Sequence, residues 1–555
     1  MKAKSFLFSL LCMAAILVGC EKKEAPIVEE DPTGGVKSYV SVSVKSSISS
    51  RLAPNVTDGG YVEGEVAENK IQSIDFYFFD GSGNPFKFNS PVTEGSTASY
   101  TNMYTVTEGL TTTSSTGNVE EVVSVTMPLQ HNMGDYPASV VAIVNGTQRF
   151  QNLPIADFRT HIFNNYATSN GFLMSNSVYK DASGAEVFST PLSESNFALS
   201  EADAKLNPIN IYVERTAVRV EVAQKTAVEK YETGYKTLLG VDSVMVYAKI
   251  VGWDIVTTAK HAYTVKKIDL TWPDQINGMT WNMPADFRSY WADASWVADS
   301  LNKQFAYNGL KNQVGLGYFD YCLENTTEPE YLETSGVHDV VASRSNVTKA
   351  VIAAVLLNAT GDTMRIANWY GQDYTIDGLK VAIANSLKNK MFYTEGGNWY
   401  PIKAEHIRFV QGSGLPGEEK SYEVYCQLTD AARAYAWASH ADGTGAIVNE
   451  DEDIYIRQNV EVAKIWNGRS YYMVNIQHMG TTEMNGTDYL PAYYGVVRNH
   501  AYQITFGAVK GLGTPVFDPG SLLPEPVLPD DTESYIDAEI NVLSWHLIQQ
   551  EVTLQ

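Results

Sequence analysis

The first regular pattern in the chain is an alternation of apolar and small polar residues at Tyr39-Val40-Ser41-Val42-Ser43-Val44. Successive side chains of a strand point to opposite faces, so this spacing predicts a half-buried β-strand. Its apolar residues share one face: Val40, Val42, Val44 and Ile48. Residues 49–54 then break the alternation, and Arg51 is expected in an accessible loop directly after the strand.

The same reasoning gives a coarse view of the body of the chain. Residues 71–79 predict a second strand that ends at the turn Asp80-Gly81-Ser82-Gly83-Asn84, whose residues tolerate positive φ. Many Gly, Asn and Thr residues between 320 and 368 indicate loops. Further strands are expected over 119–127, 136–144, 209–222, 243–253, 420–428, 471–477 and 497–506, and short helices over 151–165, 285–303 and 377–388.

The C-terminal end repeats the pattern of the N-terminal end. A linker with five prolines between 515 and 529 is semi-rigid and extended, and alternation returns beyond it, with one phase change. The apolar positions there are Ile536, Ala538, Ile540, Val542, Trp545, Ile548, Val552 and Leu554. Both ends of the chain are therefore predicted strands with aliphatic side chains at a two-residue spacing.

Two strands with this pattern could each fill the same groove, the gap left in a β-sandwich that lacks one strand. In donor-strand complementation, an extended segment from another subunit completes an incomplete sandwich, through main-chain bonds and pockets for alternate side chains. While attached, the N-terminal strand competes for its own groove at high effective concentration, and a cut at Arg51 would remove that advantage. The alternative is that Arg51 is an ordinary exposed surface residue.

The first twenty residues have the anatomy of an export signal. Met1-Lys2-Ala3-Lys4 is basic, the apolar run from 6 to 18 is too short to span a bilayer as a helix, and Leu17-Val18-Gly19-Cys20 closes it. This order favours a lipoprotein signal, with Cys20 lipidated, over an ordinary secretory signal that happens to contain a cysteine. Residues 21–35 are polar and indicate a tether.

Composition narrows the class of protein. The 555 residues include 64 acidic against 40 basic ones, a formal net charge of -24, and no basic stripe interleaved with aromatics, so nucleic acid is not expected as a partner. Its 33 tyrosines, with frequent Thr, Val and Gly, favour sheet over helix. Besides Cys12 and Cys20, only Cys322 and Cys426 occur, and the sequence fits one disulfide or two separate buried thiols equally well.

No signature of catalysis or of a cofactor site occurs: there is no Gly-x-Ser-x-Gly, phosphate loop, His-Glu-x-x-His or Cys-x-x-Cys. The Asp80 turn begins like a calcium loop but lacks the glycine at position six and the glutamate at position twelve, so we expect a hairpin turn and assign no metal. Trp281, Trp291 and Trp296 could form a sugar platform or pack in a core.

The sequence resembles the fimbrillins, subunits of type V pili, and in particular the short-fimbria, Mfa-type major subunits. The resemblance rests on the lipidation motif at Cys20, the strand followed by Arg51, and two further motifs: Val213-Glu214-Arg215-Thr216-Ala217, and the block from Arg498-Asn499-His500 to Gly511-Leu512-Gly513-Thr514-Pro515. It implies two transthyretin-like β-sandwich domains, export as a lipoprotein, cleavage between Arg51 and Leu52 by an arginine-specific protease, and a C-terminal donor strand.

These observations lead to one organisation: a signal peptide over 1–19, a lipidated propeptide over 20–51, sandwich domains over 52–208 and 209–519, and a donor segment over 520–555. The expected fold is mainly β, with a few short helices and long loop insertions. The expected function is that of a non-enzymatic shaft subunit of a surface fimbria, which supports adhesion and biofilm formation. Its precursor is expected to be a lipoprotein of the outer membrane. Expected partners are its own copies, anchor and tip subunits, the protease and host or bacterial surface receptors. The alternatives are an accessory anchor or tip fimbrillin, or a monomeric glycan-binding lipoprotein.

Overall fold

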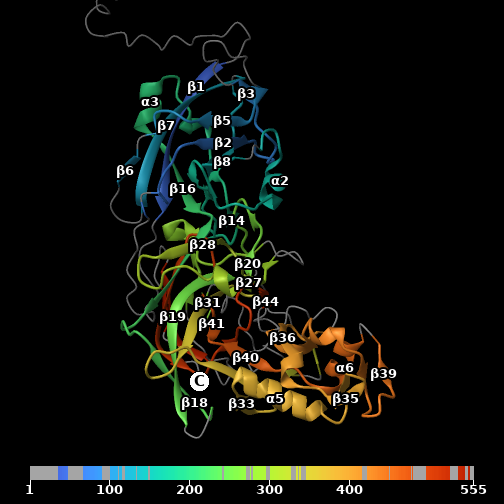
Figure 1. The fold of residues 1–555 in the computed structure, drawn as a ribbon. Helices are drawn as coiled ribbons and strands as arrows, with labels where there is room; N and C mark the ends of the chain where they lie inside the picture. Colours follow the sequence, from blue (N-terminus) through green and yellow to red (C-terminus); the bar gives the residue numbers. More distant parts are fainter. Residues whose placement is uncertain are drawn as a thin grey trace, which may run out of the picture.

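The computed structural model is mainly β, as the sequence predicts, and has two sandwiches in line with a laterally attached module (Figure 1). It describes most of residues 36–550. Outside the description lie residues 1–35, 48–64, 66, 90–99, 111, 115–118, 133, 148–149, 240–242, 271–274, 277–278, 295–300, 327–332, 335–336, 339–345, 415–421, 449–450, 477, 479–494, 525–534, 544–547 and 551–555.

The N-terminal sandwich is one eleven-stranded sheet with the strand path β4-β3-β7-β1-β16-β12-β8-β2-β5, to which β15 and β6 add at β8 and β7. Strands far apart on this path share one core, because the valines of β1 and the phenylalanines Phe76 and Phe78 of β2 belong to the same buried cluster. The strands are β1 (Val36–Ser47), β2 (Ile74–Phe79), β3 (Phe88–Asn89), β4 (Tyr100–Thr101), β5 (Met103–Val106), β6 (Thr112–Ser114), β7 (Val119–His131), β8 (Ser139–Val144), β12 (Met174–Asn176), β15 (Thr190–Pro191) and β16 (Ile209–Arg215).

The C-terminal sandwich consists of two five-stranded sheets, with the orders β28-β17-β42-β45-β46 and β18-β19-β31-β41-β43. Alternate residues of the facing strands fill the core between them, among them Val220, Ile352 and Ile504. The strands are β17 (Ala217–Gln224), β28 (Phe319–Leu323), β42 (Ala501–Lys510), β45 (Tyr535–Leu543) and β46 (Ile548–Gln550), and β18 (Tyr231–Thr237), β19 (Val244–Val256), β31 (Lys349–Leu357), β41 (Arg469–Asn475) and β43 (Thr514–Pro515).

The predicted strand over 209–222 is two strands, β16 and β17, joined at Thr216. Strand β16 pairs within the N-terminal sheet and β17 within the C-terminal one, so residues 209–215, which we expected to open the second domain, complete the first. A second core spans the junction, because Tyr77 and Phe158 pack with Trp281, Trp291 and Leu323. Trp281 and Trp291 are therefore core residues and offer no sugar platform, while Trp296 lies outside the described residues.

A module with its own hydrophobic core is inserted between β31 and β41, where the sequence suggested loops and parts of a sandwich (Figure 1, orange). Its helix α5 (Ile376–Leu387) confirms the helix expected over 377–388, and Thr375 caps it by accepting from the Gly378 N–H at 3.0 Å. The other elements are α6 (Glu452–Asn459), β32 (Arg365–Trp369), β33 (Gln372–Tyr374), β34 (Phe392–Glu395), β35 (Asn398–Pro401), β36 (Ile407–Gln411), β37 (Val424–Leu428), β38 (Trp437–Ala438), β39 (Ala446–Ile447) and β40 (Lys464–Asn467).

The remaining elements are short. Helix α2 (Ile155–Thr160) confirms the prediction over 151–165, but the helix expected over 285–303 is wrong: its described residues form a 3₁₀ turn at Pro284–Asp286 and pieces of strand. No helix in the described part of the chain is long and apolar enough to cross a membrane. Elements used below are α3 (Glu201–Leu206), β9 (Ile162–Phe163), β21 (Ala262–Tyr263), β25 (Arg288–Ser289), β27 (Gln304–Ala306) and β44 (Leu522–Pro524).

Two smaller questions from the sequence are also answered. Cys322 and Cys426 are separate, buried free thiols, and burial raises the pKa of Cys426 to about 12, so it stays protonated. The Asp80 turn is a hydrogen-bonded loop in which Oδ1 accepts from the N–H groups of Ser82 and Asn84, at 2.9 and 2.8 Å. Its carboxylate is thus already used by the backbone.

Candidate functional site

Strand β1 fills a slot between two strands of the N-terminal sheet. It pairs antiparallel with β7, from Val36↔His131 to Ser47↔Val119, and parallel with β16, from Val42↔Ile209 to Ser46↔Val213. Both edges of β1 therefore take part in ladders. Without β1, the facing edges of β7 and β16 would be left unpaired, and the sheet would be divided.

The apolar face of β1 lies in the centre of the N-terminal core. Val40, Val42 and Val44 are all 0 % exposed. Burying a valine completely is worth roughly 1.5–3 kcal/mol, so the three contribute about 5–9 kcal/mol, an upper estimate. The aliphatic side chains at a two-residue spacing are thus the residues that hold the strand in its slot.

The polar face of β1 is covered as well, which corrects the expectation of a half-buried strand. Ser38, Ser41 and Ser43 are buried, and the short helix α3 contacts this part of the sheet. Small hydroxyl side chains permit this close approach. The Ser38 Oγ lies 2.6 Å from Nε2 of His131, and Tyr39 and Ala198 exchange two backbone hydrogen bonds of 2.7 and 2.9 Å.

The C-terminal strands complete the edge of their own domain. Strand β45 runs antiparallel to β42, from Ala501↔Leu543 to Lys510↔Tyr535, and β46 pairs with β45. The tail is therefore paired with its own domain in this structure. Of the predicted donor residues, Ile536, Ala538, Ile540, Val542 and Ile548 lie in these two strands, whereas Trp545, Val552 and Leu554 lie outside the described residues.

The body of the protein holds the base of the tail firmly. Strand β44 pairs with β27, and Leu523 is 0 % exposed in a cluster with Phe305, Tyr307 and Tyr471. Just before it, the glycine motif is fixed by Trp466 Nε1, which donates to the Gly513 carbonyl at 2.9 Å. Gly513 has φ +70°, and a Cβ there would lie 2.8 Å from the Tyr471 carbonyl, so glycine is required. The tail therefore leaves the body at a fixed point.

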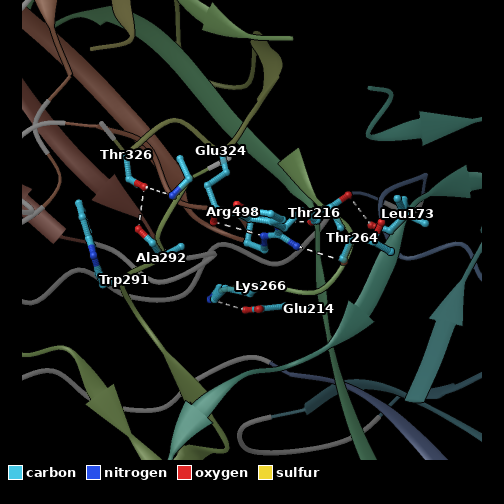
Figure 2. A network of polar contacts seen from close by, with 12 residues as sticks. Leu173, Glu214, Thr216, Thr264, Lys266, Trp291, Ala292, Glu324, Thr326 and Arg498 are labelled. Carbon is cyan, nitrogen blue, oxygen red and sulfur yellow. Dashed lines mark hydrogen bonds and ion pairs between the residues drawn. The ribbon is translucent and has the colours of Figure 1, made fainter. Parts of the chain in front are cut away.

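Polar residues buried at the junction connect the two sandwiches (Figure 2). Arg498 donates to both carboxylate oxygens of Glu324, at 3.2 and 3.1 Å, and to the Tyr263 carbonyl at 2.6 Å. Lys266 Nζ lies 2.8 Å from Oε2 of Glu214, with both side chains 0 % exposed. Buried charges persist in proteins when they are paired in this way.

The two motifs behind the family resemblance meet at this junction. Arg215 Nη1 donates to Asn499 Oδ1 at 3.3 Å, and the Asn499 N–H donates to the Ala217 carbonyl at 2.7 Å. Asn499 has φ +58°, a conformation that asparagine tolerates better than most residues. The motif residues therefore join one domain to the other.

Sequence reasoning did not predict the burial of charged residues in β17. Arg219 and Glu221 alternate with valines, a pattern typical of a strand with one face in solvent, yet they are only 3 % and 7 % exposed. Arg219 pairs with Glu68, a residue that drew no attention in the sequence, at 3.3 Å. The one available signal was the long uninterrupted strand pattern across Arg215 and Arg219, which indicates a strand covered on both faces.

The proposed lipidation and cleavage residues Cys20, Arg51 and Leu52 lie outside the described part of the chain, and so does Ile48, the last apolar residue predicted for the N-terminal strand. Among the described residues, no group of histidine, cysteine and carboxylate side chains is arranged to hold a metal ion.

Comparison with known families identifies the C-terminal region. Residues 464–551 match the model "Major fimbrial subunit protein type IV, Fimbrillin, C-terminal". The C-terminal region is therefore similar to the fimbrillins. It contains β42 and β45, the base of the tail and the Arg498 motif, so the match covers the C-terminal half of the candidate site.

Several solved structures are weakly similar to this chain. A fimbrilin (FimA) from Porphyromonas gingivalis W83 has 12% identity and a TM-score of 0.34, with 93% of this chain and 98% of that chain covered. A putative cell adhesion protein from Parabacteroides distasonis ATCC 8503 has 11% identity, a TM-score of 0.34 and the same coverage. The tip fimbrial protein Mfa3 from P. gingivalis has 10% identity and a TM-score of 0.32, with 91% and 99% covered. Likeness at this level carries no conclusion.

No curated protein matches the chain. The match over residues 464–551 supports the expected role as a fimbrial subunit. It likewise agrees with the prediction of a structural protein and not an enzyme.

Proposed function

We propose that this protein is a fimbrillin, a shaft subunit of a fimbria that is exported as a lipoprotein, cut after Arg51 and polymerised by donor-strand exchange. The observation that carries the proposal is the position of β1. It is a central strand, buried on both faces, and it is followed within a few residues by an arginine that a protease could cut.

Cleavage changes the competition for the slot between β7 and β16. As long as β1 is covalently attached, it returns to its slot at high effective concentration. Once the connection is cut, β1 is a separate peptide held by three buried valines and two ladders, and its release becomes a bimolecular equilibrium. A neighbour's tail can then take the slot and stay there.

The tail has the features that such a donor needs. Strands β45 and β46 are the last two strands of their sheet, with β45 between β42 and the edge strand β46, and the sequence of β45 alternates apolar residues as β1 does. Its base is fixed by the buried Leu523, so β45 can leave β42 without unfolding the sandwich. The Pro-rich segment between them would then span to the next subunit.

Lipidation at Cys20 belongs to the same proposal. It would hold the precursor at the outer membrane until the cut after Arg51 removes the lipid together with β1. The two events are therefore coupled: the subunit is freed from its anchor and made able to accept a donor in one step.

The test is controlled cleavage of a soluble precursor in which Cys20→Ser prevents lipidation. Treatment with an arginine-specific protease should give a cut after Arg51 and a ladder of polymers on a non-denaturing gel. Arg51→Ala should remain uncut there and monomeric, whereas Arg365→Ala, which alters an exposed arginine of the inserted module, should polymerise normally. A precursor that is cut after Arg51, releases β1 and stays monomeric would refute the proposal.

A further inference from the structure

The first described residues after the proposed cut form a compact turn. The Glu68 N–H donates to the Glu65 carbonyl at 2.8 Å, and the Glu65 N–H donates to Oε2 of Glu68 at 2.7 Å. The turn places the Glu68 side chain inward, where Glu68 is 0 % exposed. A carboxylate at such a position requires partners, because an unpaired buried charge is strongly unfavourable.

Two side chains, Arg219 and Tyr321, bind the carboxylate, and a third, Arg215, binds the backbone of the turn. Arg219 Nη1 lies 3.4 and 3.3 Å from the two carboxylate oxygens of Glu68. The Tyr321 hydroxyl donates to Oε1 of Glu68, and burial together with this hydrogen bond raises the Tyr321 pKa, so the hydroxyl remains a donor. Arg215 Nε donates to the Glu68 carbonyl at 3.1 Å, and its Nη2 contacts Oδ1 of Asn69.

The partners connect this turn to the walls of the slot. Arg215 is the last residue of β16, the strand that pairs with β1, while Arg219 lies in β17 and Tyr321 in β28 of the C-terminal sandwich. When β1 leaves, β16 keeps β12 on one side and has an open edge on the other. Its end at Arg215 is then held by Glu68, Asn69 and Asn499.

We propose that Glu68, Arg215, Arg219 and Tyr321 form a clamp that separates the part of the N-terminal segment that leaves from the part that stays, and keeps β16 positioned to receive the incoming strand. Residues before Arg51 depart with β1, while the chain from the clamp onward remains fixed to the C-terminal sandwich. Glu68 is thus a positioning residue for strand exchange. This inference rests on the proposed function.

The test uses a subunit that lacks its own tail, with residues 535–555 deleted, and a fluorescent peptide of residues 535–555 as the donor. Three single variants are compared with the parent: Glu68→Gln, the milder Tyr321→Phe, and the control Glu201→Gln, which removes an exposed pair with Lys205. The measurements are the rate of peptide uptake after the cut at Arg51, and amide hydrogen exchange over residues 67–72 before and after the cut.

With the clamp intact, the amides of residues 67–72 stay protected after the cut and the peptide is taken up. In Glu68→Gln, the buried Arg219 loses its ion pair with the Glu68 carboxylate, and we expect exchange after the cut to accelerate at least a hundredfold and uptake to fall about tenfold or more. Tyr321→Phe, which keeps the ion pair, should change both quantities in the same direction by a smaller factor. Glu201→Gln should match the parent.

Comparison of uncut and cut protein distinguishes a positioning role from general stability. A clamp predicts that Glu68→Gln alters exchange far more after β1 has left than before, whereas a merely structural residue alters both equally. If Glu68→Gln does not fold, Tyr321→Phe decides by the same comparison. If the variants take up the peptide at the parental rate and their amides at 67–72 stay as protected as in the parent, the clamp proposal is refuted. If the cut parent takes up no peptide, the proposed function fails, and the exchange comparison still tests the clamp by itself.

Discussion

Replacing Val42 by alanine should make the cut precursor exchange its strand faster. Val42 lies in the middle of β1, opposite Val125 of β7 and Ile209 of β16, and is 0 % exposed. Removing two buried methyl groups from this apolar row should cost roughly 1.5–3 kcal/mol. The backbone ladders do not change, so the loss falls on the affinity of β1 for its slot.

The free-energy cost of Val42→Ala predicts how much faster the peptide is taken up. Release of β1 from cut protein loses the contacts of Val42 before the new strand can enter, and each 1.36 kcal/mol corresponds to a factor of ten. We expect Val42→Ala to take up the 535–555 peptide about 10 to 150 times faster than the parent after the cut. Val381→Ala, at a residue of α5 that is 50 % exposed, is the matched control and should have no effect.

The product of the exchange provides the decisive comparison. Once β1 has gone, Val42 is no longer part of the subunit, so the peptide complexes of Val42→Ala and of the parent should melt at the same temperature. Two results would refute the reasoning: an unchanged rate of uptake although the uncut variant is less stable, or a peptide complex that the substitution destabilises. The second would mean that β1 remains in its slot and the donor binds elsewhere.

Three further predictions concern stability. Replacing residues 368–464 by an Asn-Gly turn should leave a folded sandwich, measured by circular dichroism and cooperative melting, because the strands on either side already pair antiparallel and the module has its own core. Lys266→Met should lower the free energy of unfolding in urea by about 3–5 kcal/mol, since it leaves Glu214 buried and unpaired, whereas Lys267→Met, at an exposed pair, should cost at most about 1 kcal/mol. Burial raises the pKa of Asp254 to about 6 from the usual 3.8, so the folded state binds the extra proton and stability falls as pH rises from about 4 to 6. Asp254→Asn should therefore be more stable than the parent above pH 6, and the difference should vanish below pH 4.

Local patterns in the sequence were sufficient to predict the positions of the strands that have a clear alternation. Strand β1, the Phe-rich strand β2 and the terminal strand β45 all lie where a two-residue period predicts them. The pattern specifies which residues share a face but not what covers that face. For this reason the alternation predicts a half-buried strand, although residues distant in sequence, in α3 and around Ala198, cover its serines.

Two features depended on contacts that no local pattern encodes. The inserted module was hidden because its strands are short and its core is assembled from residues between Ala367 and Ile465, so each piece alone looks like a loop. The polar junction was hidden because Glu68, Glu324 and Arg498 lie far apart in the sequence, and their charges are satisfied only in the fold. In contrast, the helix 376–387 has both a cap at Thr375 and an apolar face, and was predicted correctly.

The path of the chain connects the slot and the tail of one subunit through strands alone. Strand β1 pairs in parallel with β16, β16 continues through Thr216 into β17, and β17 pairs in parallel with β42, the strand on which β45 is stored. In a fibre built by the proposed exchange, a pull on the foreign strand beside β16 would therefore pass along a continuous backbone into the sheet that supports the base of the next donor. Hydrogen bonds and ion pairs at the junction fix the angle of that path at Arg215 and Arg219. The proposed exchange gives a reason for burying the charged motifs around Arg215 and Arg498 at the junction. If the junction bent freely, the slot and the tail would move independently. Neither strand could then be presented in register to the neighbouring subunit.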